Sequence, residues 1–156
     1  MSLERSLLAA QGYLELDMAS SALRELDAVA DEDQSHQDVL QMRLLIHMKS
    51  RQWGEALHIC ARLREDHPES TSGFIHSAFC LHELGRTQEA KEMLMEGPAS
   101  LLKEATYYYN LGCYDAILGN FDEAVRHLEA SFQMDKKFRE IAKYDPDLKS
   151  VQELLK

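Results

Sequence analysis

The chain has few cysteines and no long uncharged apolar run. Its three cysteines, Cys60, Cys80 and Cys113, are widely spaced and form no Cys-x-x-Cys pair. This spacing fits neither the disulfide framework of a small secreted domain nor the usual zinc-binding patterns. We therefore expect reduced, buried thiols that pack as small apolar side chains.

Positive charge is also scarce. The sequence holds 17 Lys and Arg against 27 Asp and Glu, which gives a formal net charge of −10 at pH 7. Such an excess of acid works against binding to phosphate backbones or anionic lipid, so we expect neither nucleic acid nor a membrane as a partner. Glu4 and Arg5 precede only a short apolar run, unlike the start of a signal peptide or a membrane span. The sequence predicts a cytoplasmic protein.

Motifs of the common catalytic and nucleotide-binding sites are missing. The sequence contains no HExxH, no GxSxG and no GxxxxGK[ST]. His76 and Cys80 are the one pair of soft ligands spaced to share a helix face, and two ligands do not make a metal site. We therefore predict no catalytic activity, no metal and no cofactor.

One regular spacing runs through most of the chain. The segments MASSALREL, QWGEALHIC, RTQEAKEML and NFDEAVRHL align with Ala22, Ala56, Ala90 and Ala124 in one column, at equal intervals and with no insertion. A small residue at this point of a second helix lets that helix approach its partner closely. The next apolar column contains Leu26, Cys60, Leu94 and Leu128, which we expect in a shared core. A period of about 34 residues is typical of helix-turn-helix units that stack on one another.

The fourth copy carries the most specific motif. Its YNLGCYDAILGNFDEAVRHLEASF resembles the tetratricopeptide-repeat family, with Leu111 and Gly112 in the Leu-Gly pair, Gly119 in the turn, Ala124 as the small residue and Leu128 in the large apolar place. The resemblance implies an all-α, right-handed superhelical solenoid of antiparallel helix pairs. It covers residues 1–136 as four repeats (about 3–34, 35–69, 70–103 and 104–136), with 137–156 as C-terminal capping helices.

Two charged residues depart from the family's pattern. Arg43 and Asp115 stand where the pattern has a leucine and an aromatic residue. A buried charge without a partner would cost several kcal/mol in order of magnitude. We therefore predict that both side chains reach the rim of the molecule rather than its core.

The resemblance also implies a concave groove lined by the first helix of each repeat. A groove that clamps an acidic peptide tail needs Lys, Arg and Asn donors, and the matching positions here carry other residues. The lining is mostly apolar on an acidic chain, which predicts a non-enzymatic interaction module for a hydrophobic peptide or helix with basic flanks. The predicted groove residues are Leu7, Gln11, Leu14, Gln41, Leu45, Met48, Ile75, Phe79, His82, Tyr109 and Cys113.

Three alternatives remain open at this point. The apolar C-terminal residues Leu148, Val151, Leu154 and Leu155 could fold back and fill the groove from within. The chain could be a small cytoplasmic secretion-type chaperone for a hydrophobic client, since such chaperones are similar in size, acidity and repeat type. It could also be a structural scaffold, a homo-oligomer that associates through its end faces.

Overall fold

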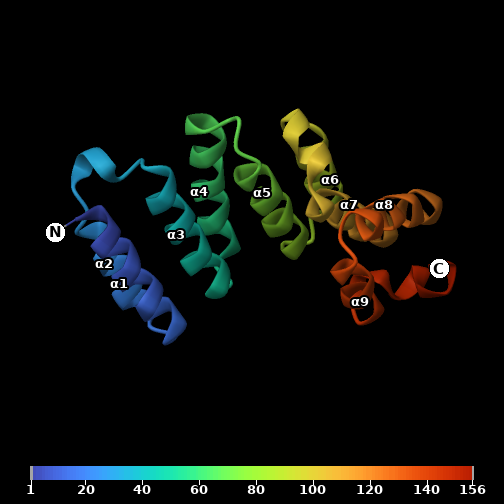
Figure 1. Ribbon diagram of the computed structural model, residues 1–156, viewed down its shortest axis with the longest axis horizontal. Helices are drawn as coiled ribbons and strands as arrows, with labels where there is room; N and C mark the ends of the chain where they lie inside the picture. Colours follow the sequence, from blue (N-terminus) through green and yellow to red (C-terminus); the bar gives the residue numbers. More distant parts are fainter. Residues whose placement is uncertain (1, 156) are drawn as a thin grey trace. The chain divides into compact units, whose positions relative to one another are not determined.

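The computed structural model describes residues 2–155, in which every regular element is a helix and no strand occurs (Figure 1). Successive helices form antiparallel hairpins, and two shorter helical segments close the chain. The all-helical, tandem-hairpin fold class expected from the sequence is confirmed. The helices are α1 (Leu3–Glu15), α2 (Ala19–Asp27), α3 (Gln37–Lys49), α4 (Trp53–Asp66), α5 (Ser72–Glu83), α6 (Thr87–Met95), α7 (Ala105–Ile117), α8 (Phe121–Met134) and α9 (Lys137–Lys143), with 3-10 turns η1 (Asp31–Asp33), η2 (Ala99–Lys103) and η3 (Pro146–Leu154).

The helix bounds follow the sequence period. The second helices begin at Ala19, Trp53, Thr87 and Phe121, at the same equal intervals as the alanine column. The first helices end at Glu15, Lys49, Glu83 and Ile117, with the same spacing. Shortly after each of these ends, the backbone takes a positive φ: 60° at Asp17, 56° at Arg51, 80° at Gly85 and 83° at Gly119. This left-handed residue ends each first helix and reverses the chain.

Contacts divide the chain into two compact units, residues 1–73 and 74–156. In the first unit α1 packs on α2, α3 packs on α4, and α3 also contacts both α1 and α2. Ala10, Ala22, Leu26 and Ile46 form a core cluster in this unit, and all four are fully buried. The predicted small-residue column is therefore part of the core here, because Ala22 leaves room for the neighbouring helix.

The second unit is centred on α7, which contacts α6, α8 and η3. α7 and α8 approach closely at Gly112, where an added Cβ would lie 2.6 Å from Cγ of Leu128. Any larger residue would push the helices apart. The Leu-Gly pair of the fourth copy therefore has a packing role, and it brings Leu128 and Ala124, both fully buried, against α7.

Asp115 corrects one sequence-based expectation. We predicted it at the rim, but its side chain is fully buried. Lys91 Nζ lies 2.7 Å from one carboxylate oxygen and His127 Nδ1 lies 2.9 Å from the other. The prediction was wrong because partners from two other helices offset the cost of burying the charge. Arg43, in contrast, reaches an exposed carboxylate, Asp27, at 2.9 Å.

The C-terminal segment folds against α7 and α8, as Figure 1 shows for α9 and the chain that follows it. Asp145 caps η3, because its side chain accepts a hydrogen bond from the backbone N–H of Asp147 and Pro146 occupies the first turn. Leu148 and Val151 are fully buried, whereas Leu154 is 50% exposed. A short α-helix and a 3-10 helix thus pack against the last helix hairpin.

Candidate partner-binding surface

In the first unit the predicted groove residues lie on α1 and α3. Leu45 is 45% exposed, and Leu7, Leu14 and Met48 are half-buried. Leu7 and Leu14 pack against the core cluster of this unit with the buried part of their side chains. The two first helices contact each other. This unit therefore presents apolar side chains that are anchored on one side and accessible on the other.

Polar groups fix the edges of this first-unit surface. The Ser72 hydroxyl donates to Oε1 of Gln41 at 2.9 Å. Lys49 Nζ donates to the Leu14 carbonyl at 2.8 Å and lies 3.1 Å from a carboxylate oxygen of Asp17. Gln11 is exposed and donates to Glu15. These contacts hold the ends of α1 and α3, so the apolar side chains between them have a defined backbone frame.

The first unit is acidic as a whole. Residues 1–73 contain 13 Asp and Glu against seven Lys and Arg, a net charge of −6 (7 − 13). An acidic surround raises the local concentration of cationic partners and disfavours acidic ones.

In the second unit the predicted residues divide into two groups. Phe79 on α5 is 37% exposed and Ile75 is half-buried. Tyr109 and Cys113 on α7 are only 6% and 5% exposed, because the C-terminal segment covers them. At Tyr109 and Cys113 the C-terminal segment thus covers the first-helix face, and of the four apolar residues that could fill the groove Leu148 and Val151 are buried whereas Leu154 is 50% exposed.

Hydrogen bonds hold the C-terminal segment against α5 and α7. The Tyr109 hydroxyl donates to Oδ2 of Asp145 at 2.6 Å, and the Cys113 thiol lies 3.7 Å from the same oxygen. His82 Nε2 lies 2.8 Å from Oδ2 of Asp147. The Tyr109 ring also packs on the Phe138 ring, with centroids 5.0 Å apart. We refer to the contacts of Asp145 and Asp147 with His82, Tyr109 and Cys113 as the C-terminal latch.

The protonation of the latch follows from one hydrogen bond at His82 and from burial at Cys113 and Tyr109. The hydrogen bond with Asp147 raises the pKa of His82 above its usual value. Burial raises the pKa of the Cys113 thiol and of the Tyr109 hydroxyl, so both stay protonated and act as donors to Asp145. The Cys113 sulfur and one carboxylate oxygen each of Asp145 and Asp147, all possible metal ligands, lie within 4.8 Å of one another. Their hydrogen bonds within the latch account for this convergence, and we assign them a structural role.

Two exposed apolar residues were missed by sequence reasoning. Leu8 and Leu16 on and just after α1 are 69% and 70% exposed, the highest exposures among the leucines described. Along an ideal helix, residues eight apart are offset by about 80°, which still falls within one broad apolar stripe. The spacing is present in the sequence, but the groove positions implied by the family resemblance select Leu7, Gln11 and Leu14 instead.

The fourth helix hairpin carries the family match. Residues 105–138 match the tetratricopeptide-repeat family model. This matched segment, 34 of the chain's 156 residues, is similar to one tetratricopeptide repeat. Within this matched repeat lie the Leu-Gly pair, the glycine turn and the buried Ala124 described above. No helix within residues 2–155 has the length and hydropathy needed to cross a membrane.

Solved tetratricopeptide-repeat structures share the fold of the chain. TTC0263, a thermophilic TPR protein from Thermus thermophilus, is 16% identical with a TM-score of 0.78, covering 97% of this chain and 86% of its own. MamA from Desulfovibrio magneticus RS-1 is 15% identical with a TM-score of 0.74, covering 88% and 80%. YrrB, described as a TPR protein with an unusual peptide-binding site, is 15% identical with a TM-score of 0.69, covering 96% and 80%. No curated protein sequence matches the chain.

Proposed function

We propose that the chain is an interaction module that binds an amphipathic peptide segment with basic flanks on the α1 and α3 surface of its first unit. The observation that carries this proposal is the exposure of Leu45 beside the half-buried Leu7, Leu14 and Met48. These leucine and methionine side chains lie on helices, so binding a partner there would not require the entropy cost of ordering a loop.

The negative charge of the first unit indicates which charges the partner segment should carry. The net charge of −6 on residues 1–73 (seven basic, 13 acidic) favours a segment whose apolar anchors are flanked by Lys or Arg. The apolar positions of the surface belong to helices, so a helical or extended partner would place side chains at regular intervals along them. The peptide-binding description of YrrB, a structure with the same fold, supports this type of function.

The test is a peptide-display selection against the wild-type chain, followed by binding measurements on a Leu45→Glu variant. We expect amphipathic peptides with basic flanks to be enriched. Their affinity should fall at least about tenfold in Leu45→Glu, because a buried unpaired carboxylate would replace an apolar anchor. Circular dichroism checks that the variant keeps its helices.

Leu84→Glu is the matched control, since Leu84 has the same residue type and the same 45% exposure but lies outside the predicted groove. Peptides selected on wild type should bind this variant with unchanged affinity. If Leu45→Glu binds them as tightly as Leu84→Glu does, the first-unit surface is not the site.

A second candidate function is self-association. It is favoured by Leu8 on α1 and Leu16 directly after α1, whose exposures of 69% and 70% place two large apolar side chains in solvent. Large apolar side chains gathered on one face are a common mark of a contact surface.

A further inference from the structure

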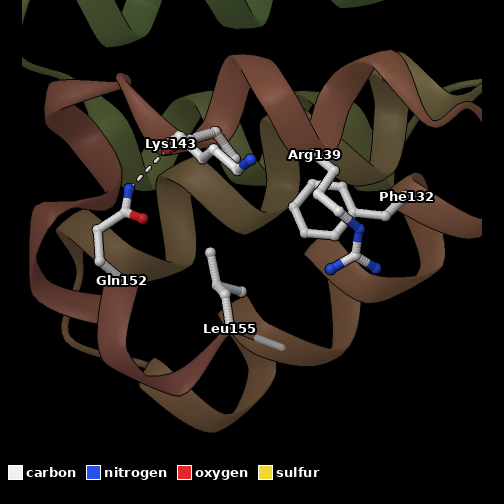
Figure 2. Close-up of a pocket in the computed structure, with 6 residues that line it drawn as sticks. Phe132, Arg139, Lys143, Gln152 and Leu155 are labelled. Atoms are coloured by element: carbon white, nitrogen blue, oxygen red, sulfur yellow. Dashed lines mark hydrogen bonds between the residues drawn. The ribbon is translucent and has the colours of Figure 1, made fainter.

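A pocket lies between α8, α9 and the end of η3, in the second unit. Its volume is about 280 Å³, and it is lined by Phe132, Arg139, Ala142, Lys143, Gln152 and Leu155. Figure 2 shows the Leu155 side chain pointing into the middle of the pocket, with Arg139 and Lys143 on the opposite side. None of these residues belongs to the predicted groove or to the C-terminal latch.

The inner wall of the pocket is apolar and rigid. Phe132 is 3% exposed and Ala142 is 1% exposed, so both are fixed in the packing of α8 and α9. The Arg139 guanidinium lies 4.9 Å from the centroid of the Phe132 ring, in front of it in Figure 2. This cation–π contact restrains the position of the guanidinium, and such restraint favours carboxylate binding.

The rim supplies charge and hydrogen-bonding groups. Lys143 Nζ is 2.8 Å from Glu140, and Arg139 is 3.6 Å from Glu129. Both cations are about half exposed, and surface ion pairs of this kind contribute little to stability. Gln152 donates its amide N–H to the Ala142 carbonyl at 2.6 Å, which fixes the side chain and leaves its oxygen as an acceptor.

Lys136 and the residues of α9 together carry a net positive charge, opposite in sign to the net charge of the chain. Residues 136–143 carry four basic side chains and one acidic side chain, in a protein with a net charge of −10. An apolar wall beside two cations fits a ligand that has both an aliphatic group and a carboxylate. Pockets for drug-sized ligands span roughly 300–1,000 Å³, so this smaller cavity suits one terminal residue better than a long acyl chain.

We propose that the pocket formed by Phe132, Arg139, Lys143, Gln152 and Leu155 binds the C-terminal residue of a partner polypeptide that ends in an aliphatic side chain. The free carboxylate pairs with Arg139 and Lys143, and the aliphatic side chain contacts Phe132 and Leu155. The Gln152 oxygen accepts the N–H of the terminal residue. The site is independent of the α1 and α3 surface, because it lies in the other unit and selects the opposite charge.

The test uses the full chain, labelled with nitrogen-15, and a synthetic hexapeptide ending in Ala-Leu with a free carboxylate. We expect the amide signals of Lys143, Gln152 and Leu155 to shift on titration. The same peptide with a C-terminal amide should bind at least about tenfold more weakly, because it lacks the charge that Arg139 and Lys143 recognise. A peptide ending in Ala-Gly should be weakened as well, since it lacks the aliphatic group.

Matched variants separate the pocket from general attraction of anions. Arg139→Gln with Lys143→Gln should weaken the free-acid peptide at least about tenfold. Lys136→Gln with Lys137→Gln removes the same charge from neighbouring positions outside the pocket and should leave affinity within about twofold. Thermal melting of each variant confirms that the fold is retained.

Three results would overturn the proposal. The first is equal affinity for the acid and the amide, the second is equal loss in the two double variants, and the third is no shift up to about 1 mM peptide. Decanoate provides a further arm. Should decanoate bind through Arg139 and Lys143 more tightly than the peptide does, the pocket recognises a fatty-acid carboxylate and not a polypeptide end.

Discussion

Four residues, one in each hairpin turn, hold the backbone in the left-handed region. Gly85 and Gly119 do so without a steric penalty, whereas Asp17 and Arg51 carry a Cβ at φ values of 60° and 56°. For a residue with a Cβ, this conformation costs roughly 1–2 kcal/mol. The geometry of the turn is therefore imposed by the packing of the two helices, and the residue at this place bears the cost.

Replacing Arg51 with glycine should stabilise the first unit. The strain of the left-handed conformation is relieved, and part of the gain is offset by the greater freedom of glycine in the unfolded chain. We expect the free energy of unfolding to rise by about 0.5–1 kcal/mol, measured by urea denaturation.

Ser50 provides the control for this prediction, because it directly precedes Arg51 and has a φ of −82°. Ser50→Gly should lower the free energy of unfolding by about 0.5–1 kcal/mol, since glycine gains nothing there. Loss of stability in both variants would show that the Arg51 side chain makes a stabilising contact that outweighs the strain.

At the scale of residues, the burial of an individual charge could not be predicted from the sequence. The spacing of the repeat placed Asp115 at a core position, and the cost of burial argued for the rim. The outcome was decided by Lys91 on α6 and His127 on α8, which meet the carboxylate from two different helices. Which polar groups meet inside a fold depends on the relative rotation of helices, and a repeat period does not specify this rotation.

At the scale of elements, the repeats could be predicted and the C-terminal segment only in part. The regular spacing of the alanine column was enough to predict the hairpins, because each has the same local turn and the same small-residue contact. The C-terminal latch instead joins Asp147 to His82, 65 residues away, and Asp145 to Tyr109, 36 residues away. Such contacts leave no periodic signal, which is why open and filled grooves could not be distinguished at this position from sequence.

The latch should make stability depend on pH through His82. Its pKa is raised in the folded state by the hydrogen bond with Asp147. The stabilisation is therefore fully present below the unfolded value of about 6.5 and is lost as pH rises through the higher folded value. The gap in unfolding free energy between wild type and His82→Gln should be about 1 kcal/mol near pH 6 and close to zero near pH 9.

His58→Gln is the control for the pH experiment, because His58 is exposed on α4 in the other unit. Its stability should follow wild type across the whole pH range. A His82→Gln gap that stays constant or grows with pH would mean that the neutral imidazole, and not its protonated form, holds the C-terminal segment.

At the scale of the whole molecule, the two proposed sites would select different partners. The first-unit surface is apolar within an acidic unit, and under our proposal it would select a segment with basic flanks. The pocket of the second unit combines Arg139 and Lys143 and selects a carboxylate. One chain could thus hold two different partner segments at once, and a partner that offered both would gain affinity from their linkage.

Self-association would add a third contact and should depend on Leu8 and Leu16. If α1 carries an isologous interface, sedimentation equilibrium of wild type should show an average mass that rises with concentration. Leu8→Glu with Leu16→Glu should remain monomeric, because paired carboxylates would face each other across the two-fold contact. Leu84→Glu with Ile117→Glu replaces two apolar residues of 45% and 50% exposure in the second unit and should associate as wild type does. A wild-type chain that stays monomeric throughout, or a control pair that also abolishes association, would remove α1 as the self-association surface.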